Sequence, residues 1–303
     1  MRQSLRWLSL ALCVLAVSTT TVLGQGFSSS IIARYRVGPN ITYLTANNFD
    51  AKPDVYSRTD GTAAQRTIIW IHGGGWTGGN KESATFNLLP YMEMGWNVVN
   101  VEYRLARISL APAAVEDCLC ALRWVIRHAT EYHFDTAKLV ISGSSAGGHL
   151  ALTTAMIPAS AGMDRQCPGT EELKVAAVVD WYGITDVADL LDGENMKTYA
   201  VQWLGSMPNR VEIAKRVSPL TYVRPGLPPI ISIQGDADPT VPYSHSVRLQ
   251  EALKKAGIDG ELVTIPGGKH GGFTRAENQR AHTAIKAFLA KHGLTPAASS
   301  NQD

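Results

Sequence analysis

Short apolar runs alternate with helical patterns along most of this chain, and that alternation limits the possible folds more than any other feature. The β-rich or apolar runs are residues 67–71, 97–103, 139–142, 175–180, 230–234 and 261–265. The helical patterns are residues 113–128, 146–156, 243–256 and 276–291. Strands that are apolar throughout are buried on both faces, so this order predicts an α/β fold with a mostly parallel central sheet and helices on both faces.

Two shorter strand-like pieces, residues 41–44 and 54–57, precede this series, and the longer, more polar segment 184–227 interrupts it. We expect that segment to run over the end of the sheet, where loops carry function. The sequence contains no domain-scale linker and no internal repeat. It therefore predicts a single domain over residues 25–294, followed by a flexible tail over residues 295–303.

Residues 1–24 have the features of a secretory signal peptide. Arg2 and Arg6 form a basic start, residues 7–17 an apolar stretch, and residues 22–24 a cleavage site of small residues. The apolar stretch is too short for a spanning helix, although a retained N-terminal anchor is the alternative. We predict a secreted or periplasmic protein with no membrane attachment after cleavage near Gly24.

Composition indicates a globular protein that does not bind nucleic acid. Of the 303 residues, 45% are hydrophobic and 18% are charged, and the formal net charge is +2 with no run of Lys or Arg. Oligomeric state cannot be predicted from these features.

Export would make a disulfide possible, because Cys118, Cys120 and Cys167 remain after the leader and its Cys13 are removed. Cys118 and Cys120 are too close along one helix to bridge easily, so Cys167 would pair with one of them. Three buried free thiols are the alternative. The cysteines lack the accompanying histidines of a zinc site, so we expect no metal.

The strongest chemical motif is Gly143-Ser144-Ser145-Ala146-Gly147, a G-x-S-x-G sequence between an apolar run and a helical pattern. In a strand–turn–helix setting, the glycines permit a sharp turn that exposes the central serine at its apex. This setting favours Ser145 as a nucleophile over the alternative, in which it only caps the helix.

A nucleophilic serine needs a base, and the base needs a carboxylate that orients it. His270 lies in a glycine-rich loop directly after the last predicted strand, which makes it the candidate base among eight histidines. Asp238 follows the strand over residues 230–234 and is the candidate carboxylate. Asp236 is expected to form a turn with its own backbone, and Asp180 and Asp186 are the alternatives to Asp238.

The glycines that follow the strand over residues 67–71 fit more than one function. Gly73, Gly75 and Gly78 match the G-x-G-x-x-G pattern of dinucleotide sites, with Glu102 about where a ribose-binding acid would lie. A phosphate-binding loop is disfavoured, because Asn80-Lys81-Glu82 stands where that motif needs Gly-Lys-Ser/Thr. An H-G-G-G turn that supplies oxyanion donors is the third possibility, and it agrees with the serine motif.

The chain resembles the α/β-hydrolase esterases of the H-G-G-G type, and more narrowly the acetyl-xylan and feruloyl esterase-like branch near the hormone-sensitive-lipase group. The matching segments are DVY (54–56), HGGGWTGGNK (72–81), EYRLA (102–106), GSSAGGHLA (143–151), SPLTYV (218–223), GDADPTVP (235–242) and KHGG (269–272). The resemblance implies an α/β-hydrolase fold and an oxyanion hole formed by the backbone N–H groups of Gly73, Gly74 and Ala146. It also implies that no large N-terminal cap covers the site. Trp76 would either line the pocket or pack in the core.

We therefore predict a secreted serine carboxylesterase in which Ser145, His270 and Asp238 act through an acyl-enzyme without a cofactor. Its substrate would be a small-molecule ester, or an acetyl or feruloyl ester linked to a polysaccharide. The alternatives are a peptidase or amidase that uses the same three residues, and a non-catalytic binding protein on a hydrolase scaffold.

Overall fold

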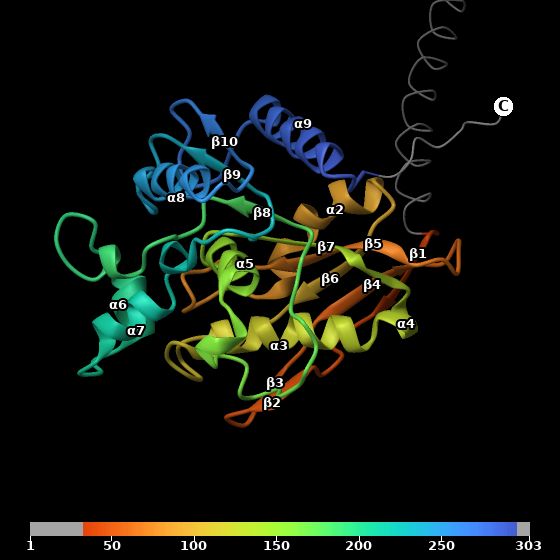
Figure 1. Cartoon of the computed structure of the whole chain (residues 1–303), viewed down its shortest axis with the longest axis horizontal. Helices are drawn as coiled ribbons and strands as arrows, with labels where there is room; N and C mark the ends of the chain where they lie inside the picture. The colour runs from red at the N-terminus through yellow and green to blue at the C-terminus, as the bar shows by residue number, and fades with distance from the viewer. Residues whose placement is uncertain (1–32, 296–303) are drawn as a thin grey trace, which may run out of the picture.

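The structure is a computed structural model, and it describes residues 33–295. An eight-stranded sheet forms its centre, in the order β1-β4-β6-β5-β7-β8-β9-β10 (Figure 1). Its strands are β1 (Tyr35–Gly38), β4 (Asp54–Arg58), β5 (Gln65–Ile71), β6 (Asn97–Val101), β7 (Phe134–Ser144), β8 (Ala177–Trp181), β9 (Ile230–Gly235) and β10 (Gly260–Ile265). From β6 to β10 every pairing is parallel, whereas β4 pairs antiparallel with both β1 and β6. The prediction of a mostly parallel sheet is confirmed.

Helices cover both faces of this sheet, as predicted. Along β5, Ile69 and Ile71 belong to a core cluster shared with α3, α5 and α8, while Ile68 and Trp70 belong to a second cluster shared with α2 and α9. Alternate residues of a strand point to opposite faces, so a strand that is apolar throughout contributes to both clusters. The α-helices are α2 (Thr85–Glu93), α3 (Ala113–Arg127), α4 (Ala129–Tyr132), α5 (Ala146–Met156), α6 (Thr198–Leu204), α7 (Arg210–Arg216), α8 (Ser244–Lys255) and α9 (Arg275–Lys291).

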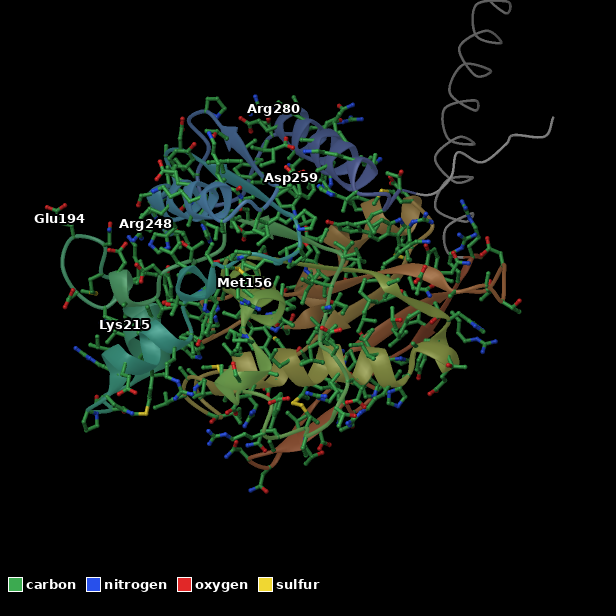
Figure 2. The ribbon with its side chains drawn as sticks, in the orientation of Figure 1. Met156, Glu194, Lys215, Arg248, Asp259 and Arg280 are labelled. Carbon is green, nitrogen blue, oxygen red and sulfur yellow. A yellow bond between two sulfur atoms is a disulfide. The ribbon has the colours of Figure 1, made fainter. Side chains whose placement is uncertain are left out.

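The segment 184–227, expected to run over the end of the sheet, contains α6, α7 and two short 3-10 helices. It projects from the end of the sheet beside α8 and carries exposed charged side chains such as Glu194 and Lys215 (Figure 2). By contrast Met156, at the end of α5, is fully buried. The strand predicted over residues 41–44 was wrong, because β2 begins only at Leu44. The sequence analysis also did not identify α2, which contains Pro90.

β2 (Leu44–Ala46) and β3 (Phe49–Ala51) form a separate hairpin that packs near a disulfide between Cys120 and Cys167. Cys118 is a buried free thiol. The structure therefore settles which of the two neighbouring cysteines pairs with Cys167.

The predicted signal peptide lies outside the described residues, as does nearly all of the predicted tail. None of the helices described within residues 33–295 is long and apolar enough to cross a membrane. In the same part of the chain, no helix precedes β5 and no cluster of His, Cys, Asp and Glu could hold a metal ion.

Candidate active site

Ser145 occupies a sharp turn between β7 and α5. Its backbone angles are φ 58° and ψ −121°, a conformation that L-residues adopt rarely, and its N–H donates to the carbonyl of Trp181 at 2.8 Å. The two flanking glycines are required by close backbone contacts. A Cβ on Gly147 would lie 2.1 Å from the Ile71 carbonyl oxygen, and one on Gly143 would lie 2.4 Å from Gly147. The predicted nucleophile turn is thus formed, with its serine at the apex.

The structure brings the three predicted catalytic residues together in one hydrogen-bonded series. The Nε2 atom of His270 lies 2.8 Å from Ser145 Oγ, and Nδ1 lies 2.8 Å from Asp238 Oδ2. Because the carboxylate can only accept, Nδ1 carries the proton and Nε2 is free to accept the serine proton. This is the tautomer that a general base needs.

Asp238 is held in place by the loop that carries it. Its Oδ1 accepts hydrogen bonds from the N–H groups of Thr240 at 2.8 Å and Val241 at 3.0 Å. Burial alone would raise the pKa of Asp238, but the hydrogen bonds from His270, Val241 and Thr240 outweigh it and lower that pKa. The carboxylate therefore stays ionised beside His270, as an orienting group must.

The other aspartates considered from the sequence have different partners. Asp236 accepts from the N–H of Gly267 at 2.6 Å, so the prediction that it bonds its own turn was wrong, and Asp238 plays that part instead. Asp180 is fully buried and accepts from the Gly183 N–H and the Ser232 hydroxyl. Asp186 pairs with Arg248 on α8.

The glycine turn after β5 lies against the nucleophile. A Cβ on Gly73 would be 3.4 Å from Ser145 Cβ, and Gly74 has a φ of +124°, which disfavours any side chain. His72 shapes this turn, because its Nδ1 donates to the Gly73 carbonyl at 2.7 Å and its ring stacks on Tyr103. Burial lowers the pKa of His72 to about 4, so the imidazole stays neutral.

The residues that suggested nucleotide binding are engaged within the protein. The Glu102 carboxylate accepts from the Lys81 backbone N–H at 3.0 Å. The Lys81 ammonium is buried and pairs with Asp54 and Glu82, each at 2.9 Å. Neither side chain is left to bind a ribose or a phosphate.

Trp76 belongs to the core and not to a pocket wall, which settles the alternative left open by the sequence. It is fully buried, stacks on Trp203 at 4.1 Å, and donates through Nε1 to His149 at 3.2 Å. His149 is a packed residue whose Nε2 donates to the Val217 carbonyl, and burial lowers its pKa to about 3.

Two tyrosines beside the site carry no sequence motif and were missed. The Tyr199 hydroxyl donates to the Thr240 carbonyl at 3.0 Å, and its side chain lies against Gly75, so it joins the aspartate loop to the glycine turn. The Tyr182 ring contacts His270. Only the position of Tyr182 directly after a predicted strand end could have drawn attention to it.

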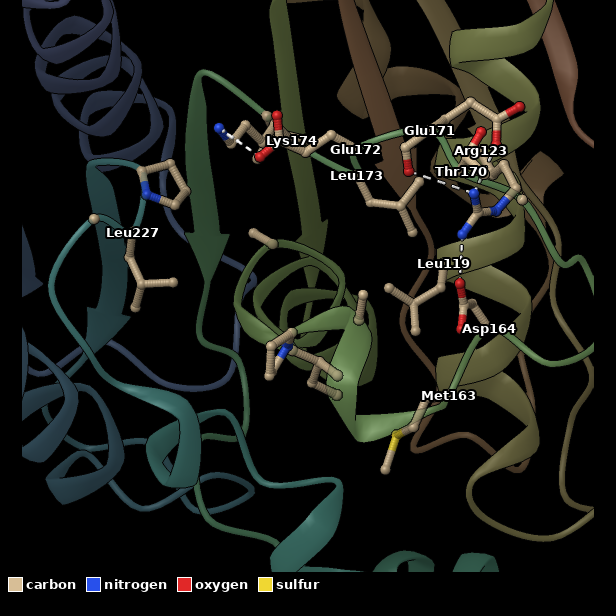
Figure 3. A pocket seen from close by; sticks show the side chains of 18 of the residues that line it. Leu119, Arg123, Met163, Asp164, Thr170, Glu171, Glu172, Leu173, Lys174 and Leu227 are labelled. Carbon is tan, nitrogen blue, oxygen red and sulfur yellow. Dashed lines mark hydrogen bonds and ion pairs between the residues drawn. The ribbon is translucent and has the colours of Figure 1, made fainter.

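Ser145, Asp238 and His270 follow the carboxyl ends of β7, β9 and β10, the edge where open α/β sheets place their sites. A cavity of about 700 Å³ lies at the opposite edge, lined by residues just before β8 and β9 together with Arg123, which pairs with Glu171 and Asp164 (Figure 3). A smaller one of about 220 Å³ is lined by Ser144, Tyr182 and Gly271, which adjoin the triad. The larger cavity is therefore separate from the reacting groups.

Comparisons with known proteins agree with this geometry. The family model BD-FAE matches residues 53–253, and that of TAP-like proteins matches residues 206–301. Esterase 2 of Thermogutta terrifontis, a solved structure, has a TM-score of 0.72 and 30% identity, covering 88% of this chain and 95% of that chain. The predicted α/β-hydrolase fold is thereby confirmed.

Two curated relatives come from Mycobacterium tuberculosis. The probable carboxylic ester hydrolase LipM is 31% identical over 85% of this chain, and the esterase LipQ is 32% identical over 77%. The chain spans 61% of the length of LipM and 57% of that of LipQ.

Proposed function

We propose that this chain, which belongs to the BD-FAE family, is a serine carboxylesterase that cleaves esters through a covalent acyl-enzyme. The hydrogen-bonded series from Ser145 through His270 to Asp238 is the observation that carries the proposal. The names of LipM, LipQ and the Thermogutta esterase support ester hydrolysis as the reaction.

In the proposed reaction, Ser145 Oγ attacks the ester carbonyl carbon while its proton passes to His270 Nε2. The imidazolium so formed is stabilised by Asp238, and it returns the proton to the departing alcohol oxygen. Water then attacks the acyl carbon and gives a proton to the same nitrogen, which passes it to Ser145 Oγ as the bond from the acyl carbon to Oγ breaks, so that the acid leaves and the serine is regenerated.

We assign the backbone N–H groups of Gly73, Gly74 and Ala146 to the oxygen that becomes negative during both steps. Preorganised donors at this oxygen are worth about 3 kcal/mol each. The helix N-terminus at Ala146 favours negative charge at the same position.

Replacing Ser145 with Ala should abolish p-nitrophenyl acetate hydrolysis and labelling by a fluorophosphonate serine probe. Ser83→Ala, which changes an exposed serine whose described hydrogen bonds are to Asn80, is the matched control and should keep both. Hydrolysis by the Ser145→Ala variant at the rate of the control would refute the assignment.

The same experiment separates the alternatives. A non-catalytic binding protein on this scaffold would neither turn over the ester nor react with the probe. A peptidase or amidase would also hydrolyse p-nitroacetanilide in a reaction that Ser145→Ala abolishes, whereas we expect turnover of the ester only.

We further propose that the enzyme is secreted or periplasmic and acts on acetyl or feruloyl esters of polysaccharide. The disulfide between Cys120 and Cys167 supports export, because such bonds persist in oxidising compartments. Cell fractionation and N-terminal sequencing of the mature protein test the location. A panel of acetylated and feruloylated oligosaccharides beside simple esters tests the substrate, and a preference for the simple esters would refute it.

A further inference from the structure

Tyr182 places its ring against the imidazole of His270. The ring centroids are 4.7 Å apart and the ring planes are inclined by 60°. This separation is within the roughly 6 Å over which an aromatic face attracts a cation. The two imidazole nitrogens are engaged by Asp238 and Ser145, and the inclined contact between the two rings adds to these hydrogen bonds.

The backbone at Tyr182 is strained, and its neighbours hold it in that conformation. Its φ is +44°, in the left-handed region that bulky residues avoid. The Tyr182 N–H donates to the Ile233 carbonyl at 2.8 Å, and the adjacent Gly183 N–H donates to Asp180 at 2.9 Å. Strain of this kind persists where surrounding structure fixes it, and it gathers at functional sites.

The same turn is tied to the nucleophile. The carbonyl of Trp181 accepts from the Ser145 N–H at 2.8 Å, so one short stretch after β8 contacts both the serine and the histidine. The phenol of Tyr182 packs closely against the loop that carries His270, because a Cβ on Gly271 would lie 3.0 Å from the Tyr182 hydroxyl oxygen. Burial raises the pKa of Tyr182 to about 12, so the phenol is neutral at working pH.

We propose that Tyr182 is a positioning residue for His270, whose aromatic ring fixes the imidazole plane and stabilises the imidazolium formed in each step. This inference rests on the proposed esterase function. It assigns no proton transfer to the phenol, since the ring and not the hydroxyl makes the contact. A neutral aromatic ring favours the transition state, in which His270 is charged, over the resting state, in which it is neutral.

The test compares variants at residue 182 by steady-state kinetics on p-nitrophenyl acetate. Tyr182→Phe keeps the ring and should retain kcat within about twofold. Tyr182→Leu removes the ring but is as strained as tyrosine at this φ, and it should lower kcat by roughly 2- to 30-fold with KM little changed. Fluorinated phenylalanines at the same position should lower kcat stepwise as the ring face loses negative charge.

Phe273→Leu is the matched control, because Phe273 packs on Tyr182 at 5.9 Å and makes no described ring contact with His270. Thermal unfolding of each variant shows whether it is folded. The inference is wrong if Tyr182→Leu matches the control, if only KM rises, or if the fluorinated series is flat. The fluorinated series decides the question should Tyr182→Leu fail to fold. An inactive wild-type protein that does not react with the fluorophosphonate would instead refute the proposed function.

Discussion

Replacing Gly73 with alanine tests whether the glycine turn supplies oxyanion donors or only shapes the site. The new Cβ would lie 2.7 Å from the Ser144 carbonyl oxygen and 3.3 Å from its hydroxyl. Ordinary contacts begin at 3.4 Å, so the turn and the strand end must separate by about 0.7 Å. The nearer neighbour is a backbone carbonyl at the nucleophile turn, which leaves the glycine turn to move.

That displacement is large compared with the range in which an oxyanion donor works, about 2.7 to 3.1 Å from the oxygen. Loss of one such donor costs about 2.7 to 4 kcal/mol, which corresponds to a decrease in kcat of about 100- to 1,000-fold. KM should change far less, because the donor acts on charge that develops only in the transition state.

Gly78→Ala provides the control within the same turn. Its Cβ would meet nothing closer than the Gly74 carbonyl oxygen at 3.9 Å, and its φ is not in the left-handed region. We expect nearly unchanged kinetics for this variant. Should Gly73→Ala raise only KM, or should both variants lose activity equally, the turn would be scaffold and the assignment of its N–H groups would be wrong.

Three further predictions concern stability. Arg104 donates to the fully buried Asp117 through Nε and Nη2. Asp117→Ala removes this partner and leaves the buried Arg104 guanidinium with only the longer ion pair to Glu116 at 3.6 Å, so it should lower the free energy of unfolding by about 3 kcal/mol in urea titrations. A loss under about 1 kcal/mol would contradict this. Reducing the disulfide between Cys120 and Cys167, which are 47 residues apart, should lower the free energy of unfolding by about 2 to 4 kcal/mol, with ester hydrolysis retained in buffer without denaturant. An unchanged unfolding midpoint would contradict this prediction. Burial raises the pKa of Asp180 from 3.8 to about 7, so the folded protein keeps a proton that the unfolded chain has released. Its contribution to the free energy of unfolding is therefore complete below about pH 4 and is lost as the pH rises towards 7. Asp180→Asn should make the free energy of unfolding depend less on pH over this range, which urea titrations at several pH values measure.

The part of the site that the sequence predicted best is the part that short-range geometry determines. Between a strand and a helix, the glycines around Ser145 are expected to form a sharp turn. The helix that follows, α5, begins and ends at the predicted residues. Asp238 and His270 were found because each follows a strand whose end lies at the same edge of a parallel sheet.

The features that the sequence did not predict depend on contacts between distant segments. Cys118 and Cys120 are two positions apart on α3, which turns them about 200° from each other. Cys118 therefore faces the main core, and Cys120 faces the β2–β3 hairpin and Cys167. Which direction each would face could not be known before the packing of α3. Tyr182 is similar, because its orientation depends on a hydrogen bond to Ile233, which lies on the next strand of the sheet.

Backbone strain shows how this fold holds the reacting groups. Among residues 33–295, seven non-glycine residues have positive φ, and three of them are asparagines, which tolerate that conformation. Of the other four, Ser145 is the candidate nucleophile, Tyr182 contacts His270, and Trp76 directly follows the glycine turn. Each is held by a core contact or a hydrogen bond from another segment, so packing between segments fixes the geometry together with the local sequence. Tyr182→Gly would relieve the strain at its turn and leave that turn free to relax, with a loss of the alignment between Ser145 and His270.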